Sequence, residues 1–99
     1  MATLHILSHS PFTDSRLTSC LQLLGAQDAV LLTGEAVYAL QPGSTPLNTL
    51  SALPDSVALF ALDEDLQARG LGTPARVTAL DYVAFVELCT RFNRVNSWL

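Results

Sequence analysis

The length, composition and charge of this chain limit both its fold and its class of function. Its 99 residues fit one compact domain, because autonomous domains usually contain about 100 to 150 residues, and we expect a single domain over residues 1–99. Apolar residues make up 49% of the chain and charged residues 14%, which excludes intrinsic disorder. So small a domain buries too little of that apolar surface alone, and the composition predicts permanent association with partner subunits.

The charges argue against direct binding to nucleic acid. All five basic residues are arginines and the net charge is −4, whereas phosphate neutralisation needs a clustered basic patch. No apolar run reaches the roughly 20 residues of a membrane helix or resembles a signal peptide. Cys20 and Cys89 form no CxxC motif and no zinc-ligand set. We therefore expect a cytoplasmic protein with reduced thiols.

The first third of the chain predicts a strand, a helix and a second strand. Thr3–Ser8 is rich in β-formers and ends before the turn pair Ser10-Pro11. Ala29–Thr33 is continuously apolar, as expected of a strand covered on both faces, and Gly34 ends it. The helix between them has Asp14 or Thr13 as its expected N-cap and Gly25 as its stop, and it carries an apolar stripe of Leu17, Cys20, Leu21 and Leu24.

The pattern is weaker between Glu35 and Pro54. Val37–Leu40 fits either a short helix or an extra strand, and Leu47–Leu53 fits a helical turn. Val57–Leu62 is the third clear strand.

Two further helices are predicted in the last third of the chain, with a strand between them. Asp63–Asp65 open a short helix that Arg69 and Gly70 close, which matches the helix dipole. Arg76–Leu80 predicts a fourth strand. The final helix follows the cap candidate Asp81, and we expect it to pack on the sheet through a stripe of Tyr82, Phe85, Val86 and Cys89.

Short apolar strands that alternate with amphipathic helices predict an α/β fold. We expect a mostly parallel sheet of four to five strands with helices on both faces, connected by right-handed crossovers. Sites in such sheets lie at the carboxyl ends of the strands. The residues expected at that edge are Ser8–Pro11, Thr33–Glu35, Asp63–Asp65 and Asp81.

The histidines and acids give weak indications of chemistry. His5 and His9 would lie about 13 Å apart on a strand, too far to share one metal ion. His9 is the better functional candidate because it lies in the loop at the carboxyl edge, although lone loop histidines are usually just solvated. The acids of Asp63–Asp65 suit a divalent cation, but three adjacent acids at a helix start more often cap the helix. With no nucleotide-binding motif in the sequence, we expect neither a metal nor a cofactor.

Cys20 and Cys89 are the two groups that could hold a persulfide. Helical periodicity places both in apolar stripes, where thiols are buried and inert. Cys20 is the better candidate for a persulfide carrier, because Arg16 lies one turn earlier and could lower its pKa. At the end of the chain, Trp98 needs an apolar site, either on this chain or in a neighbouring subunit.

Several segments resemble the TusB/DsrH family of sulfur-relay proteins, and the resemblance covers nearly the whole chain. Its most specific part is the block ALDEDLQARGL at Ala61–Leu71. The other matching segments are Leu4-His5, Ser10-Pro11, Ala29–Leu32, Asp81-Tyr82 and Phe85-Val86.

The resemblance implies a DsrE/DsrF/DsrH-like fold and a subunit of a cytoplasmic hetero-hexamer, in which TusB-, TusC- and TusD-like subunits form two trimers. In that family the complex takes persulfide sulfur from a TusA-like donor and passes it to a TusE-like acceptor, for 2-thiolation of the wobble uridine of tRNA. The carrier cysteine belongs to the TusD subunit, which implies a mainly structural and docking role for this chain.

Three alternatives stay open. The DsrH branch implies a role in dissimilatory sulfur oxidation, and its first-helix cysteine resembles Cys20. In the second alternative, the chain itself is a sulfurtransferase that uses Cys20 as its persulfide carrier. A free-standing domain that binds a small ligand at the strand ends is the third. No family role is implied for Cys89.

Overall fold

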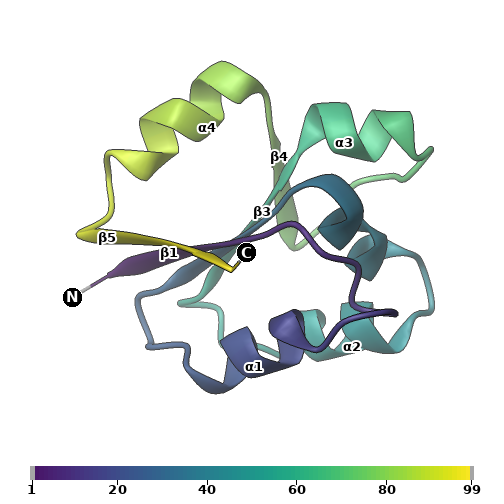
Figure 1. Cartoon of the computed structure of the whole chain (residues 1–99), viewed down its shortest axis with the longest axis horizontal. Helices are drawn as coiled ribbons and strands as arrows, with labels where there is room; N and C mark the ends of the chain where they lie inside the picture. The colour runs from purple at the N-terminus through teal and green to yellow at the C-terminus, as the bar shows by residue number, and fades with distance from the viewer. Residues whose placement is uncertain (1, 99) are drawn as a thin grey trace.

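The computed structural model describes residues 2–98 and contains one five-stranded sheet (Figure 1). Every neighbouring pair of strands is parallel, and the strand order is β4-β3-β2-β1-β5. This confirms the predicted α/β class. The strands are β1 (Thr3–Leu7), β2 (Ala29–Leu32), β3 (Ala58–Leu62), β4 (Val77–Leu80) and β5 (Arg94–Trp98).

The crossover direction decides which helix covers which face of the sheet. From β1 to β4 the chain moves across the sheet in one direction, so right-handed crossovers place the connecting helices on one face. The connection from β4 to β5 returns in the opposite direction and places α4 on the other face, as Figure 1 shows. The helices are α1 (Arg16–Gln22), the 3-10 helix η1 (Gly34–Leu40), α2 (Thr45–Ser51), α3 (Asp63–Ala68) and α4 (Tyr82–Cys89). None of the helices described is long and apolar enough to cross a membrane.

The two faces of the sheet have cores of unequal size. The larger cluster joins alternate strand residues such as Leu7 and Val30 to α1, η1, α2 and α3. The smaller one joins Leu4, Ala29 and Leu31 to Leu88 of α4. Both faces are therefore covered, as predicted, but the second by a single helix.

The predicted start of the first helix was displaced by one residue. Ser15 is the N-cap of α1 and makes no side-chain capping bond. Asp14 contributes from the preceding turn, since its carboxylate accepts the backbone N–H of Arg16 at 2.8 Å. The predicted stripe faces the core, with Leu17 and Cys20 buried and Leu21 and Leu24 packed against them.

The ambiguous stretch between Glu35 and Pro54 forms two short helices. The segment that suited either a helix or a strand lies in η1, and its residues Val37 and Leu40 are buried. Helix α2 starts at the N-cap Ser44, whose hydroxyl accepts the backbone N–H of Leu47 at 3.3 Å.

The predicted buried stripe of the last helix was wrong in half of its members. Asp81 does cap α4, accepting the backbone N–H of Ala84 at 2.7 Å. However, Tyr82 and Val86 are 65% and 51% exposed, while Leu88 is buried. Almost every position of this helix is apolar, so periodicity could not select the face that meets the sheet.

The location of the fifth strand was not predicted. β5 pairs with β1 along its whole length, from Thr3 opposite Arg94 to Leu7 opposite Trp98. It is an edge strand whose residues are exposed except for Trp98, which is half-buried. The apolar run that marks a covered strand is therefore missing from its sequence.

Arg76 holds the connection between α2 and β3 against β4. Its guanidinium donates to the carbonyls of Ser51, Leu53, Pro54 and Val57 at 2.6–3.2 Å. These carbonyls lie at the end of α2 and in the segment after it, so one planar cation joins four acceptors of that connection.

We predict that Arg76→Met lowers the free energy of unfolding by about 2 kcal/mol, because hydrogen bonds to a charged donor are lost while the apolar stem is kept. Urea denaturation measures this. Arg94→Met is the matched control, since Arg94 is exposed, and it should change the stability little. Equal stability of Arg76→Met and the wild type would contradict the prediction.

Candidate functional site

The carboxyl ends of β1, β2 and β3 meet at one edge of the sheet. The backbone N–H and the hydroxyl of Thr33 donate to the carbonyl of Leu7 at 2.9 and 3.0 Å. The backbone N–H of Gly34 donates to Asp65 at 2.8 Å. Gly34 has φ +51°, and a Cβ there would lie 3.5 Å from the carbonyl oxygen of Ser8. The structure thus brings three of the four predicted edge segments together, whereas Asp81 serves as the cap of α4.

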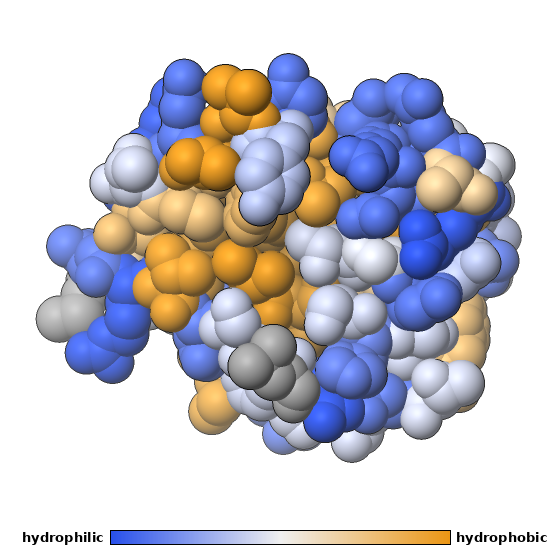
Figure 2. Space-filling model, turned by 45° about the horizontal axis from the view of Figure 1, so that its top comes forward, coloured by the Kyte–Doolittle hydropathy of each residue, from blue (hydrophilic) through white to orange (hydrophobic). Residues whose placement is uncertain are grey.

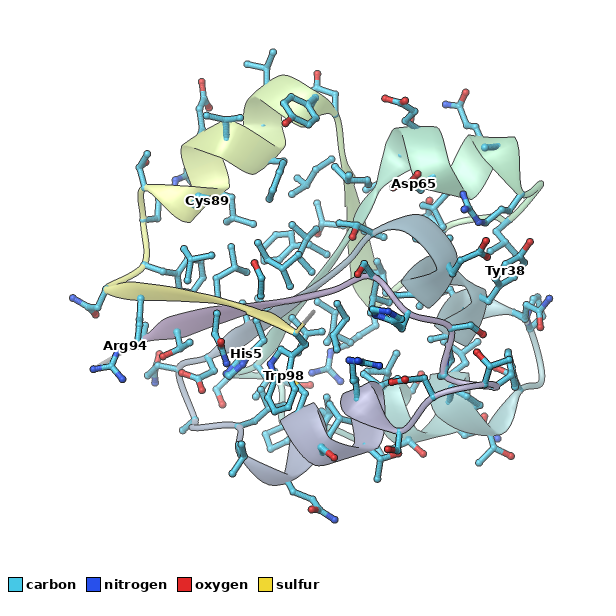
Figure 3. The ribbon with its side chains drawn as sticks, in the orientation of Figure 1. His5, Tyr38, Asp65, Cys89, Arg94 and Trp98 are labelled. Carbon is cyan, nitrogen blue, oxygen red and sulfur yellow. The ribbon has the colours of Figure 1, made fainter. Side chains whose placement is uncertain are left out.

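Arg69 closes this edge from the side of α3. Its guanidinium lies 3.5 Å from the carboxylate of Glu35 and 3.6 Å from that of Asp65, and it stacks over the ring of Tyr38 at 5.6 Å. Figure 3 shows Tyr38 and Asp65 on this side of the molecule. The Arg69 cation lies beside one acid of η1, Glu35, and one acid of α3, Asp65. The arrangement therefore holds α3 against η1.

Two of the three acids in Asp63–Asp65 are engaged in local contacts. Asp63 accepts from the side chain of Gln67 at 2.6 Å, and Asp65 binds Gly34 and Arg69. Within residues 2–98, no three His, Cys, Asp or Glu side chains lie close enough together to hold a metal ion. His9 is exposed, with Nδ1 3.5 Å from the hydroxyl of Ser8. Its proposed chemical role stays a prediction.

A buried polar network lies on the α1 side of the sheet, and sequence reasoning missed it. His5 and Asp28 are 5% and 6% exposed. The Nε2 atom of His5 lies 3.3 Å from Oδ2 of Asp28, and the indole N–H of Trp98 donates to Nδ1 of His5 at 3.1 Å. Figure 3 shows His5 and Trp98 side by side. The signal in the sequence was a histidine within an apolar strand, with an acid directly before the next strand.

The two contacts of His5 fix its tautomer. An indole N–H can only donate, so Nδ1 of His5 must be the acceptor and carry no proton. The ring proton then lies on Nε2 and is donated to Asp28. Trp98, which needed an apolar site, finds it on this chain, against the larger core cluster.

Asp28 connects β1 to the turn that precedes β2. Besides His5 it accepts the backbone N–H groups of Thr3 and Gly25, both at 2.9 Å. Burial raises the pKa of Asp28, but the backbone donors Gly25 and Thr3, together with His5, outweigh it and hold the pKa below its ordinary value of 3.8. The folded state is therefore stabilised by the ionised carboxylate.

Cys20 is fully buried, and its surroundings oppose ionisation. Burial, with the nearby carboxylate of Asp28, raises the pKa of the Cys20 thiol from 9.0 to about 12. The expectation that Arg16 lowers this pKa was wrong, because the guanidinium of Arg16 pairs with Asp14. Cys89 is half-buried at the end of α4, beside the smaller core cluster.

We predict that the chain loses stability in acid through Asp28. Its folded-state pKa is depressed, so its contribution is complete above the ordinary value of 3.8 and is lost as the pH falls through the lower folded-state pKa. Asp28→Asn should lower the free energy of unfolding by about 1–3 kcal/mol at pH 7 and flatten the dependence on acid. Denaturation between pH 2 and 7 tests this, with the exposed Asp55→Asn as control. An unchanged acid dependence in Asp28→Asn would exclude this role.

The arrangement of strands and helices is shared with a solved structure. The chain is similar to the YchN protein of Escherichia coli, with a TM-score of 0.73 and 18% sequence identity. The match covers 99% of this chain and 100% of that one. At this identity the likeness establishes the fold.

Curated relatives match at higher identity and almost full length. Protein TusB of Erwinia tasmaniensis is 40% identical, and Protein TusB of Serratia proteamaculans is 38% identical. Each match covers 96% of this chain and 99% of the relative. The model of the family described as DsrH like protein matches residues 9–95. The chain therefore belongs to the DsrH-like family and is a homologue of the TusB proteins.

Proposed function

We propose that this chain is the TusB-type subunit of a cytoplasmic sulfurtransferase complex with TusC- and TusD-like subunits, arranged as two trimers. The complex relays persulfide sulfur from a TusA-like donor to a TusE-like acceptor, for 2-thiolation of the wobble uridine in tRNA. The similarity to TusB proteins over nearly the full length of both chains is the observation that carries the proposal.

Within this complex we assign the chain a structural and docking role. Persulfide sulfur moves when an acceptor thiolate attacks the outer sulfur of the donor persulfide. A new S–S bond forms, the old one breaks, and the donor cysteine leaves as a thiolate, so no external oxidant is needed. A thiol with a pKa of about 12 and no exposed surface is poorly suited to this attack, which supports a carrier thiol on another subunit.

The assembly is tested by co-expression. We predict that this chain co-purifies with TusC- and TusD-like subunits as one stable complex, because its composition leaves apolar surface that a partner must cover. Size-exclusion chromatography with light scattering gives the stoichiometry. Absence of a complex with these subunits would contradict the proposal, and assembly with DsrE- and DsrF-like subunits instead would favour the sulfur-oxidation alternative.

The role of Cys20 as a persulfide carrier stays a prediction of the sequence, and it has a direct test. We expect Cys20 in the native complex to remain unmodified by a persulfide donor and to react with a thiol reagent only after unfolding in urea, because the buried thiol is neutral at pH 7. Mass mapping of the labelled cysteine distinguishes the outcomes, with Cys20→Ala as the control for assignment. Stoichiometric persulfidation of native Cys20 would establish the alternative.

A further inference from the structure

Trp98 attaches the edge strand β5 to the core through a hydrogen bond that requires a neutral histidine. The indole N–H donates to Nδ1 of His5 at 3.1 Å. Nδ1 accepts only while it carries no proton, and the ring proton on Nε2 is donated to Asp28. The other four residues of β5 are exposed, whereas Trp98 packs against the larger core cluster. The attachment of this strand by its side chains therefore depends on the protonation state of one buried ring.

Protonation of His5 removes the acceptor of this bond. An imidazolium carries a proton on both nitrogens and can only donate. Its second N–H would face the indole N–H across 3.1 Å, where two donors repel each other and neither has a partner. Turning the ring over replaces Nδ1 with a C–H group, which offers the indole no acceptor either. The docked position of Trp98 is therefore compatible with the neutral ring and incompatible with the cation.

The burial of His5 strengthens this incompatibility. The residue is 5% exposed, and a buried cation is costly unless all its N–H groups are paired or hydrated. Trp98 lies beside the imidazole, as Figure 3 shows, with the two ring centroids 6.2 Å apart. When the indole moves away, Nδ1 becomes accessible to water and the cation is hydrated. Release of Trp98 and uptake of the proton thus favour each other.

We propose that protonation of His5 releases the Trp98 end of β5 from the domain. The imidazolium keeps its bond to Asp28, now as an ion pair, while the indole loses its acceptor and turns towards solvent. Imidazole is the side chain whose charge ordinarily changes between about pH 5 and 8, so a contact of this kind responds to modest changes in pH. The last strand of the described chain is therefore held by a proton-sensitive contact.

The ionisable groups that face His5 from the α1 side determine the sign of this effect. Asp28, in the turn before β2, holds a pKa below its ordinary 3.8, so its carboxylate stays charged while a histidine titrates. On α1, the thiol of Cys20 stays neutral, because burial and Asp28 raise its pKa to about 12. Arg16 of the same helix pairs with Asp14. The charge of Asp28 therefore favours the protonated ring.

The strands on either side of β1 add little charge. Val30 of β2 and Asn96 of β5 lie opposite His5 in the sheet, and neither ionises. Alternation of side chains along a strand places Arg94, which lies opposite Thr3, on the same face as His5. Arg94 is exposed, so its charge is screened by water and salt. The effect therefore rests on the contacts of His5 with Trp98 and Asp28.

Trp98 reports on its own position, because it is the one tryptophan among the 99 residues. Quenching of its fluorescence by acrylamide, which is uncharged, measures how accessible the indole is to solvent. Trp98 packs on the α1 side of the sheet, away from the apolar surface that Figure 2 shows over α4. Association of the chain through that surface should leave the quenching unchanged.

The experiment follows acrylamide quenching of the full-length chain from about pH 8 to 5. In the wild type, the quenching constant should rise as the pH falls, while the far-UV circular dichroism stays constant. His5→Gln keeps an amide N–H that can donate to Asp28 but takes up no proton in this range, so its quenching should not depend on pH. His9→Gln is the matched control, because His9 is the second histidine and is exposed, and its response should equal that of the wild type.

The coupling also acts in the opposite direction, which gives a second measurement independent of whether His5→Gln folds. Trp98→Phe keeps an aromatic ring but removes the N–H donor, so the neutral form of His5 loses its bond. NMR of the imidazole should show that His5 takes up its proton at a pH about one unit higher than in the wild type, which corresponds to a coupling of about tenfold.

Three results would overturn the proposal. The first is quenching of the wild type that does not depend on pH, or that depends on it equally in His5→Gln. The second is proton uptake by His5 at the same pH in Trp98→Phe and in the wild type, as expected of a merely structural contact. The third is loss of circular dichroism in step with the quenching, because the whole domain would then unfold.

The inference concerns this chain alone and extends beyond its proposed function. A Trp98 that stays docked at every pH would contradict the proton-sensitive contact and leave the proposed complex intact. Failure of the chain to bind TusC- and TusD-like subunits would contradict the proposed function alone.

Discussion

The handedness of the crossovers between parallel strands determines what this small domain can bury. Three connections lead the chain from β1 to β4 in one direction and place their helices on one face. A single return connection, through α4, crosses to β5 on the other face. Among residues 2–98, α4 is the helix that covers this face. The thinner cover on that face is thus a consequence of the topology of the described strands.

The edge strand β5 is attached to the rest of the domain through a side chain on the α1 side of the sheet. Its side chains contribute little burial, because all of them except Trp98 are exposed. Trp98 reaches the network of His5 and Asp28, in which each polar group has a partner of the complementary kind. Asp28 also holds the backbone of Thr3 and Gly25. One carboxylate therefore orders the amino ends of β1 and β2, while the indole bond joins β5 to them through His5.

Sequence reasoning succeeded where burial imposes a period and failed where contacts are between distant segments. The apolar runs of β2 and β3 identify covered strands, and the cap Asp81 locates the start of α4. β5 carries no such pattern, because an edge strand needs little apolar surface. In the candidate site, the clustering of Thr33 and Gly34 with Asp65 followed from the strand-end rule. The bond from Trp98 to His5 joins residues 93 positions apart, and no local pattern encodes it.

The environment of Cys20 connects the core to the proposed role. The thiol lies at the contact of α1 with the sheet, and the carboxylate of Asp28 disfavours the thiolate there. To expose Cys20, α1 would have to leave the larger cluster, and activating its thiol would also require a change near the carboxylate that orders β1 and β2. A reactive Cys20 would require an exposed α1 and a displaced Asp28, whereas a stable fold requires both to stay in place. A relay complex avoids this conflict when the carrier thiol lies on one subunit and another subunit supplies rigid surfaces for docking.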